Sequence, residues 1–177
     1  MTERGRALVK FARARVRQEL GGPIAVPPDA PWSQEPCGTF VTLRWRDGDL
    51  QGCIGNLDAD RAIVLDVAHN AVAAAVRDPR GRRLALADLE ELDVELSILS
   101  ALEPIGDESE IRVGHDGVVL LYRGRRATFL PVMWQVLPDR ETFMRELERK
   151  AGLPAVIEGR ELQLLRYTAE HHRDPAP

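Results

Sequence analysis

The sequence predicts an α+β fold, and three features support that prediction. Asp47-Gly48 lies between two runs of apolar and β-branched residues, which is a strong short-range signal for a β-hairpin. Other segments repeat their apolar residues at helical spacing. Helices and hairpins follow one another without regular βαβ alternation, so we expect mixed or antiparallel sheets with flanking helices. At 177 residues the chain fits a single domain, residues 1–177, with room for two lobes.

The predicted helices are bounded by residues that start or stop helices. They cover residues 3–20, 60–77, 86–92 and 140–151. Gly21-Gly22-Pro23 stops the first of them, and Gly152 closes the last. Asp58 or Asp60 can cap the helix that begins near residue 60, and Asp78-Pro79 ends it because the residue before a proline disfavours the helical conformation.

The predicted strands are short and lie between glycine-containing turns. They cover residues 39–46, 49–54, 93–100, 111–113, 118–123, 126–130 and 161–167. In the segment 93–100, Val94, Leu96 and Ile98 alternate with polar residues, which is typical of a half-buried strand. The residues after 167 are predicted to form a polar tail.

Composition excludes several classes of protein. The chain is 44% hydrophobic and 29% charged, the balance of a folded globular protein. Its formal net charge of −4 argues against broad nucleic-acid binding. No apolar run approaches the roughly 20 residues of a membrane-spanning helix, and arginines interrupt the N-terminus where a signal peptide would be apolar. With two cysteines there is no disulfide framework, so we expect a cytoplasmic protein with reduced thiols.

The hairpin carries the main candidate chemical centre, Gly52-Cys53-Ile54-Gly55. A two-residue turn at Asp47-Gly48 would place Thr42 opposite Cys53 and Trp45 opposite Leu50. Cys53 would then share a polar face with Thr42 and Arg44, while Trp45, Leu50 and Ile54 would belong to a core face. A cation near a cysteine favours the reactive thiolate. Glycines at 52 and 55 would leave backbone amides open to a ligand.

A structural role for Cys53 stays open beside the chemical one. Free cysteines usually pack as small hydrophobes, and a Gly-Cys-Ile-Gly run is also compatible with a bend in a strand. A three-residue turn would move Cys53 to the other face of the sheet. Cys37 would lie about 16 Å from Cys53 along the ladder, whereas a disulfide needs Cα atoms within about 7 Å, so the two are not predicted to pair.

The helix predicted over 60–77 offers a second set of polar candidates. Asp66, His69 and Asn70 lie three and four residues apart and therefore share one face of that helix. A carboxylate can orient an imidazole for general-base catalysis, so His69, oriented by Asp66, could serve Cys53 if the helix packs over the hairpin. A surface histidine with a structural hydrogen bond is the alternative.

Neither metal nor cofactor binding is predicted. The cysteines and the histidines at 69 and 115 lack the close paired spacing of zinc sites, and there is no glycine-rich phosphate loop. Two basic clusters are left, and they either coat a solvated surface or bind an anion or RNA. They comprise Arg80, Arg82 and Arg83, and then Arg123, Arg125 and Arg126.

The ordered set of motifs resembles the AMMECR-one domain family, whose prokaryotic members are called AmmeMemoRadiSam system protein A. The resemblance covers nearly the whole chain. It rests on Phe40-Val41-Thr42-Leu43, Gly52-Cys53-Ile54-Gly55, Asn70 to Ala75 with Asp78-Pro79-Arg80, Leu96 to Ser100 with Glu103-Pro104-Ile105, Phe129-Leu130-Pro131 and Lys150-Ala151-Gly152-Leu153.

The resemblance implies an α+β fold whose cysteine motif lies in or near a cleft between two lobes. It also implies genomic company with a Memo-like protein and a radical-SAM enzyme, but no established reaction. The sequence departs from the family pattern in three places. Gln51 stands where the motif usually has arginine, Gly81-Arg82-Arg83 replaces Phe-Pro-Pro, and the tryptophan that usually follows Ala-Gly-Leu is missing, with Val156 nearby.

Two functions follow as alternatives. In the first, the chain is an accessory protein that binds a partner or substrate beside the Memo-like protein and the radical-SAM enzyme. Its binding residues would be Gly52, Ile54, Gly55, Thr42, Arg44 and Asn70. In the second, it is a small cysteine-dependent enzyme that uses Cys53, with His69 and Asp66 as its catalytic helpers. A small-molecule ligand fits either function, and whether the chain is an enzyme stays open.

Overall fold

The computed structural model describes residues 1–153 and 162–175 and divides the chain into two compact units. The first unit comprises Met1–Leu99 with Glu170–Pro177, and the second comprises Ser100–Ala169. Each unit has its own four-stranded sheet and its own buried apolar cluster. The described pairings with an assigned register are antiparallel, as is common in α+β folds.

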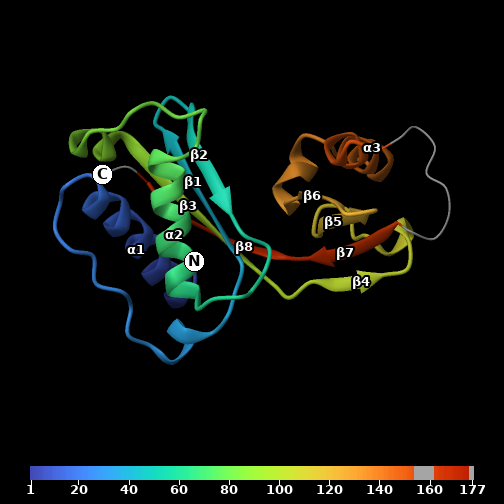
Figure 1. Ribbon diagram of the computed structural model, residues 1–177, viewed down its shortest axis with the longest axis horizontal. Coiled ribbons are helices and arrows are strands. Elements are labelled where there is room, and N and C mark those ends of the chain that lie inside the picture. The colour runs from blue at the N-terminus through green and yellow to red at the C-terminus, as the bar shows by residue number, and fades with distance from the viewer. Residues whose placement is uncertain (154–161, 176–177) are drawn as a thin grey trace. The chain divides into compact units, whose positions relative to one another are not determined.

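The first unit packs two helices on one side of its sheet (Figure 1). The strands stand in the order β2-β1-β3-β8. The elements are α1 (Glu3–Glu19), β1 (Thr39–Trp45), β2 (Leu50–Gly55), α2 (Ile63–Val76), β3 (Leu92–Leu99) and β8 (Ala169–Asp174), with short 3₁₀ helices at Pro31–Gln34 and Leu86–Glu91. Buried side chains such as Val41, Leu43 and Leu96 face the helices.

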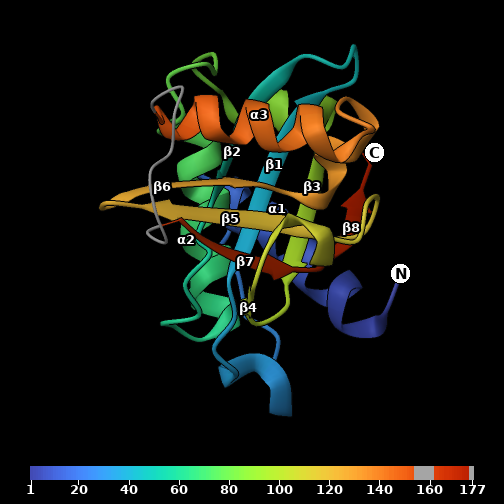
Figure 2. The same ribbon diagram turned by 90° about the vertical axis from the view of Figure 1, so that its right-hand side faces the viewer.

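In the second unit, helix α3 lies along one side of a sheet with the strand order β4-β7-β5-β6 (Figure 2). Its elements are β4 (Glu103–Ile105), β5 (Gly117–Tyr122), β6 (Arg125–Phe129), α3 (Arg140–Ala151) and β7 (Gln163–Tyr167), with 3₁₀ helices at Glu108–Glu110 and Pro131–Gln135. Its core contains Phe143, whose ring stacks on Trp134 at a centroid distance of 3.8 Å.

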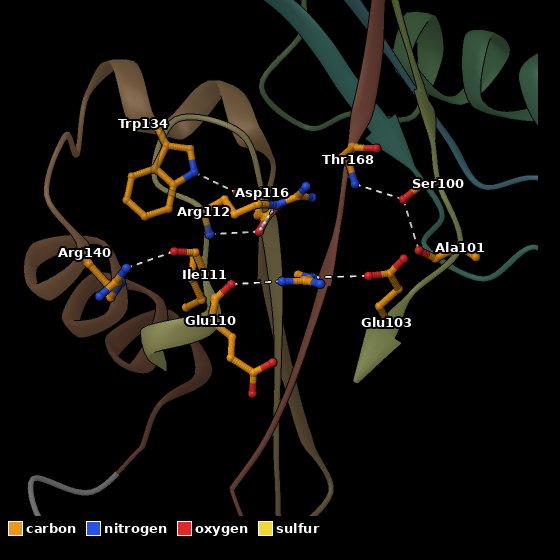
Figure 3. Close-up of polar contacts among 11 residues, drawn as sticks. Ser100, Ala101, Glu103, Glu110, Ile111, Arg112, Asp116, Trp134, Arg140 and Thr168 are labelled. Atoms are coloured by element: carbon orange, nitrogen blue, oxygen red, sulfur yellow. Dashed lines mark hydrogen bonds and ion pairs between the residues drawn. The ribbon is translucent and has the colours of Figure 1, made fainter. Parts of the chain in front are cut away.

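A buried carboxylate organises the turn that leads into β5 (Figure 3). Asp116 accepts hydrogen bonds from the backbone N–H of Arg112 at 2.9 Å and from its guanidinium, and its carbonyl accepts the indole N–H of Trp134 at 2.7 Å. Burial alone would raise the pKa of Asp116, but the bonds and charge of Arg112 outweigh it and lower the pKa. The turn therefore keeps an ionised carboxylate in the interior of the unit.

The hairpin β1–β2 combines a longer turn than predicted with a compensating β-bulge. Trp45 N–H bonds to the carbonyl of Asp49 at 2.8 Å, so three residues, 46–48, make the turn, and Gly48 has a φ of 96°. The register then shifts, so that Arg44 lies opposite Leu50 and Leu43 opposite Gly52. Gln51 is the extra residue. The two changes cancel, and Thr42 lies opposite Cys53 as predicted.

The same bulge makes part of the predicted register wrong. Leu50 faces Arg44 instead of Trp45 and is half-buried, so it does not belong to the predicted core face. Gln51 is 1% exposed rather than on the polar side. The sequence pattern missed this because a bulge leaves no signal in the alternation of apolar residues.

Most predicted elements are confirmed, and the errors fall at weak local signals. The strand expected at 111–113 does not form, and Ala62, not Asp58 or Asp60, precedes α2 without a side-chain cap. The short strand β4 was not predicted, and β8 occupies residues that the sequence assigns to a polar tail. Part of the strand expected at 161–167 and Val156 lie outside the described residues.

Strand β8 is held to the first unit by Arg13, a buried arginine of α1. Its guanidinium forms an ion pair with Asp174 at 2.5 Å, donates to the Asp174 carbonyl at 2.7 Å and donates to the Leu89 carbonyl at 3.1 Å. Nearby, the ring of His172 lies where a side chain at Gly5 would be, so only glycine fits at that point of α1. A tertiary ion pair with Arg13 thus holds Asp174, at the end of this polar segment, in the strand.

We predict that Arg13→Ala lowers the free energy of unfolding by about 2 kcal/mol or more, because it leaves the Asp174 carboxylate and three carbonyl groups without their partner. Arg17→Ala is the matched control, since Arg17 forms a more exposed ion pair with Glu90 at 2.8 Å and should cost less than about 1 kcal/mol. Urea unfolding measures both. Equal losses in the two variants would contradict the role given to Arg13.

Candidate functional site

The side of the first sheet that faces away from α1 and α2 carries a row of polar side chains. Thr42 on β1 lies opposite Cys53 on β2 and opposite Glu95 on β3. Ser97 on β3 bonds to the Nδ1 atom of His171 on β8 at 3.0 Å. We call Thr42, Cys53, Glu95, Ser97 and His171 the polar face. It crosses all four strands of the sheet, whereas the opposite side is apolar.

The sulfur of Cys53 lies beside a hydroxyl group and within electrostatic reach of a guanidinium. Thr42 Oγ1 donates to Cys53 Sγ at 3.2 Å. Arg80 Nη2 contacts the Cys53 carbonyl at 3.5 Å, and negative charge at Cys53 contributes to the raised pKa of Arg80, after the hydrogen bonds to Asp78. A hydroxyl donor and a cation therefore both lie near Cys53. Arg44, the cation expected there, instead donates to the Gly48 carbonyl in the turn at 3.0 Å.

Asp78 holds the backbone of Cys53 in place. Its carboxylate accepts the Cys53 N–H at 2.9 Å and two bonds from the Arg80 guanidinium at 2.9 and 2.6 Å. These bonds from Arg80 hold the pKa of Asp78 well below its usual range, against the opposing effect of burial. Because β2 is an edge strand, Asp78 and Arg80 satisfy the outward N–H and C=O groups that a pairing strand would otherwise take.

The two motif glycines serve packing within the first unit. A Cβ atom at Gly52 would lie 2.1 Å from the Ala74 carbonyl oxygen of α2. A Cβ atom at Gly55 would lie 2.1 Å from the ring of Phe40. Both positions exclude a side chain because another part of the unit already occupies the space. Ile54 is half-buried and packs against the core of this unit.

Gln51 contacts the segment Gly81-Arg82-Arg83, and both depart from the pattern that the motif resemblance implies. The amide of Gln51 donates to the carbonyls of Ala75 at 3.2 Å and Arg82 at 2.8 Å, and its oxygen accepts the N–H of Arg82 at 3.2 Å and the indole N–H of Trp45 at 3.1 Å. A Cβ atom at Gly81 would lie 2.3 Å from the Gln51 carbonyl oxygen. Gln51 therefore anchors the loop that contains Gly81-Arg82-Arg83, and it is satisfied as a buried amide should be.

Asp66 and Asn70 form a buried network that does not include His69. Asp66 Oδ2 accepts the backbone N–H of Thr39 at 2.9 Å, the Thr39 hydroxyl at 2.7 Å and the amide of Asn70 at 2.9 Å. Burial raises the pKa of Asp66 despite these bonds. The network ties the start of β1 to α2, so Asp66 and Asn70 have a structural role and Asp66 does not orient His69.

His69 is exposed on α2, and α2 covers the side of the sheet opposite Cys53. The predicted arrangement of Cys53, His69 and Asp66 is therefore not formed in the first unit. The imidazole on the side of Cys53 is that of His171, and burial lowers its pKa against the charge of Glu95, which favours the neutral ring. Sequence reasoning missed it because a predicted polar tail gives no indication of sheet pairing.

Within the described ranges, no group of three or more histidine, cysteine, aspartate or glutamate side chains is arranged to hold a metal ion. None of the helices in those ranges is both long and apolar enough to cross a membrane.

The chain is similar to proteins from archaea and bacteria. A family model described as AMMECR1 matches residues 9–172. A protein of Methanothermobacter thermautotrophicus is 35% identical over 162 residues, which cover 86% of this chain and 84% of the relative. A protein of Thermotoga maritima is 34% identical over 137 residues and covers 77% of each chain. The crystal structure of an uncharacterised protein from Pyrococcus horikoshii superposes with a TM-score of 0.87 at 29% identity, over 100% of this chain and 94% of that one.

We predict that iodoacetamide modifies Cys53 at least about tenfold faster than Cys37 in the native protein. Burial raises the pKa of the Cys37 thiol, which donates to the Leu99 carbonyl at 3.3 Å, whereas Cys53 is only half-buried. Mass spectrometry of time points at pH 7 measures both rates, and the two should converge in denaturant. Faster modification of Cys37 in the native state would contradict the geometry.

We predict that Asp78→Asn lowers the free energy of unfolding by about 2 kcal/mol at pH 7, because the charged hydrogen bonds from Arg80 are weakened. A carboxyl with a depressed folded-state pKa stabilises the protein above its unfolded value of about 4, and that stabilisation is lost as the pH falls further. The difference between wild type and variant should therefore shrink below about pH 4. A difference that is independent of pH in urea unfolding would contradict this.

Proposed function

Since this chain belongs to the AMMECR1 family, we propose that it acts as an accessory protein that binds a partner or its substrate through the polar face of the first unit. The partners we propose are a Memo-like protein and a radical-SAM enzyme, in line with the resemblance of the motifs to the AmmeMemoRadiSam system. A cytoplasmic location is part of the same proposal, and so is the cleft around the cysteine motif.

The observation that supports a binding role is the composition of the polar face. Its residues offer a thiol, two hydroxyls, a carboxylate and an imidazole on four neighbouring strands. Neighbouring strands lie about 4.8 Å apart, so the row from Cys53 to His171 spans about 14 Å. Polar groups spread over such a distance fit an extended contact with another molecule better than the concerted attack of one nucleophile.

The surroundings of Cys53 also favour a binding role over a catalytic one. In the described part of the first unit, the side chain bonded to its sulfur is the Thr42 hydroxyl, and no histidine or carboxylate side chain makes such a bond. A cysteine enzyme usually activates its thiol with a base within hydrogen-bonding distance. Thr42 and Arg80 cannot take the proton from a thiol, because one is a hydroxyl and the other is always charged.

A cysteine-dependent enzyme is the second candidate, and one observation favours it. The Thr42 hydroxyl bonds to the sulfur of Cys53, and the Arg80 guanidinium contacts the carbonyl of the same residue. In that function the base must come from outside the pair Asp66 and His69, since Asp66 is engaged with Thr39 and Asn70.

We predict that Cys53→Ser keeps its affinity for the purified Memo-like partner within about threefold, because one sulfur contributes little to an interface. Glu95→Lys, which reverses a charge on the polar face, should weaken binding at least about tenfold. Glu19→Lys makes the same change of charge at an exposed position of α1 and is the matched control. Isothermal titration calorimetry measures the three affinities, and melting curves check the fold.

These variants separate the two functions. Loss of affinity in Cys53→Ser with an unchanged melting curve would favour cysteine chemistry over the binding role. Equal affinities of Glu95→Lys and Glu19→Lys for the partner would show that the polar face is not part of the interface. Substitution of Gly55 is not a usable test, because a larger residue there would displace the Phe40 ring and disturb folding.

A further inference from the structure

The tip of the β5–β6 hairpin in the second unit carries three arginines in four residues, Arg123-Gly124-Arg125-Arg126. Figure 2 shows this hairpin reaching past the end of β7. The turn residues Arg123 and Gly124 have φ values of 46° and 78°, so both are in the left-handed region. Two-residue hairpins of this kind usually carry asparagine, aspartate or glycine at these positions.

Arginine at a left-handed turn position is uncommon and costs conformational energy. Among the described residues that are not glycine, Arg123 is the one with a positive φ. Its side chain extends over the Tyr122 ring, with the guanidinium carbon 5.3 Å from the ring centroid. A residue that the backbone disfavours indicates that its side chain is useful at that place.

The side chains of this tip line a hollow with a volume of about 380 Å³. Arg123, Arg125 and Arg126 contribute to it, together with Gln163 from the neighbouring strand β7. Arg123 and Arg125 also line an adjoining hollow of about 460 Å³. Both volumes lie in the range of sites that hold small molecules. No carboxylate occurs among the described residues that line either hollow.

The chemistry of this lining favours an oxyanion. Guanidinium groups stay charged at any physiological pH and present paired N–H donors that match the oxygens of a phosphate. The Gln163 amide offers further donors. Arg125 is already fixed, because it donates to the carbonyl of Gly152 at the end of α3. Arg123 and Arg126 also have partners, so an anion must compete for them.

We propose that this hollow binds the phosphate group of a small phosphate ester. The inference does not depend on the polar face of the first unit or on Cys53. Competition for the arginines predicts an affinity that is moderate and falls as the salt concentration rises. The occupant is a small molecule because the basic residues cluster at one hairpin tip, while the chain as a whole has a net charge of −4.

The test is an isothermal calorimetric titration of the full chain with pyrophosphate at low ionic strength. The wild type should bind saturably, and Arg123→Asn with Arg126→Gln should weaken binding at least about tenfold, since charged hydrogen bonds are lost. Asparagine tolerates the left-handed backbone at 123, so this variant should keep its fold. Arg77→Asn with Arg83→Gln removes the same two charges at exposed positions of the first unit and should leave the affinity unchanged.

Three results would overturn the proposal. The first is the absence of saturable binding by the wild type below about 10 mM pyrophosphate. The second is equal weakening in the two double variants, which would mean that net charge alone attracts the anion. The third is tight binding of a single-stranded RNA oligonucleotide without binding of pyrophosphate, which would replace the small ligand with a nucleic-acid strand.

Discussion

The carboxylate of Asp78 connects the end of a helix, the edge of the sheet and the candidate site in the first unit. Asp78 follows the last turn of α2, with its N–H bonded to the Ala73 carbonyl at 3.1 Å, and its side chain then accepts the N–H of Cys53 on the edge strand β2. The same carboxylate orients Arg80, which contacts the Cys53 carbonyl. The backbone of this residue therefore bonds to the end of a helix, while its side chain covers a sheet edge and fixes the backbone of the candidate site. The Asp78-Pro79-Arg80 motif is explained by these contacts.

The close approach of β2 to α2 is the second constraint on this region. Gly52 allows the strand to pass within van der Waals distance of the Ala74 carbonyl, and the bulge at Gln51 turns an amide toward Ala75 and Arg82. The family pattern has an arginine in place of Gln51. In this chain the side-chain amide of Gln51 makes four hydrogen bonds in a buried position, where a guanidinium would introduce a buried charge. Gly81 leaves room for the Gln51 backbone in this chain.

The polar face and the arginine hairpin are different kinds of site. The polar face combines a thiol, hydroxyls, a carboxylate and an imidazole, and each of them can change its hydrogen bonding with a partner. The hairpin tip presents permanent positive charge around a hollow. The first arrangement suits recognition of a polar surface, and the second suits a small anion. They lie in separate units, so variants in one unit can be interpreted without changing the other.

The sequence by itself determined the fold class, the three α-helices and the β1–β2 hairpin. These follow from local periodicity and turn chemistry, which act between residues close in the chain. Only the tertiary structure decided that Asp66 serves Thr39 rather than His69, that Gly52 and Gly55 are filled by neighbouring groups, and that β8 forms from a polar segment. Each of these depends on contacts between residues distant in sequence, as in the bond from Arg13 to Asp174, and no local pattern records such a contact.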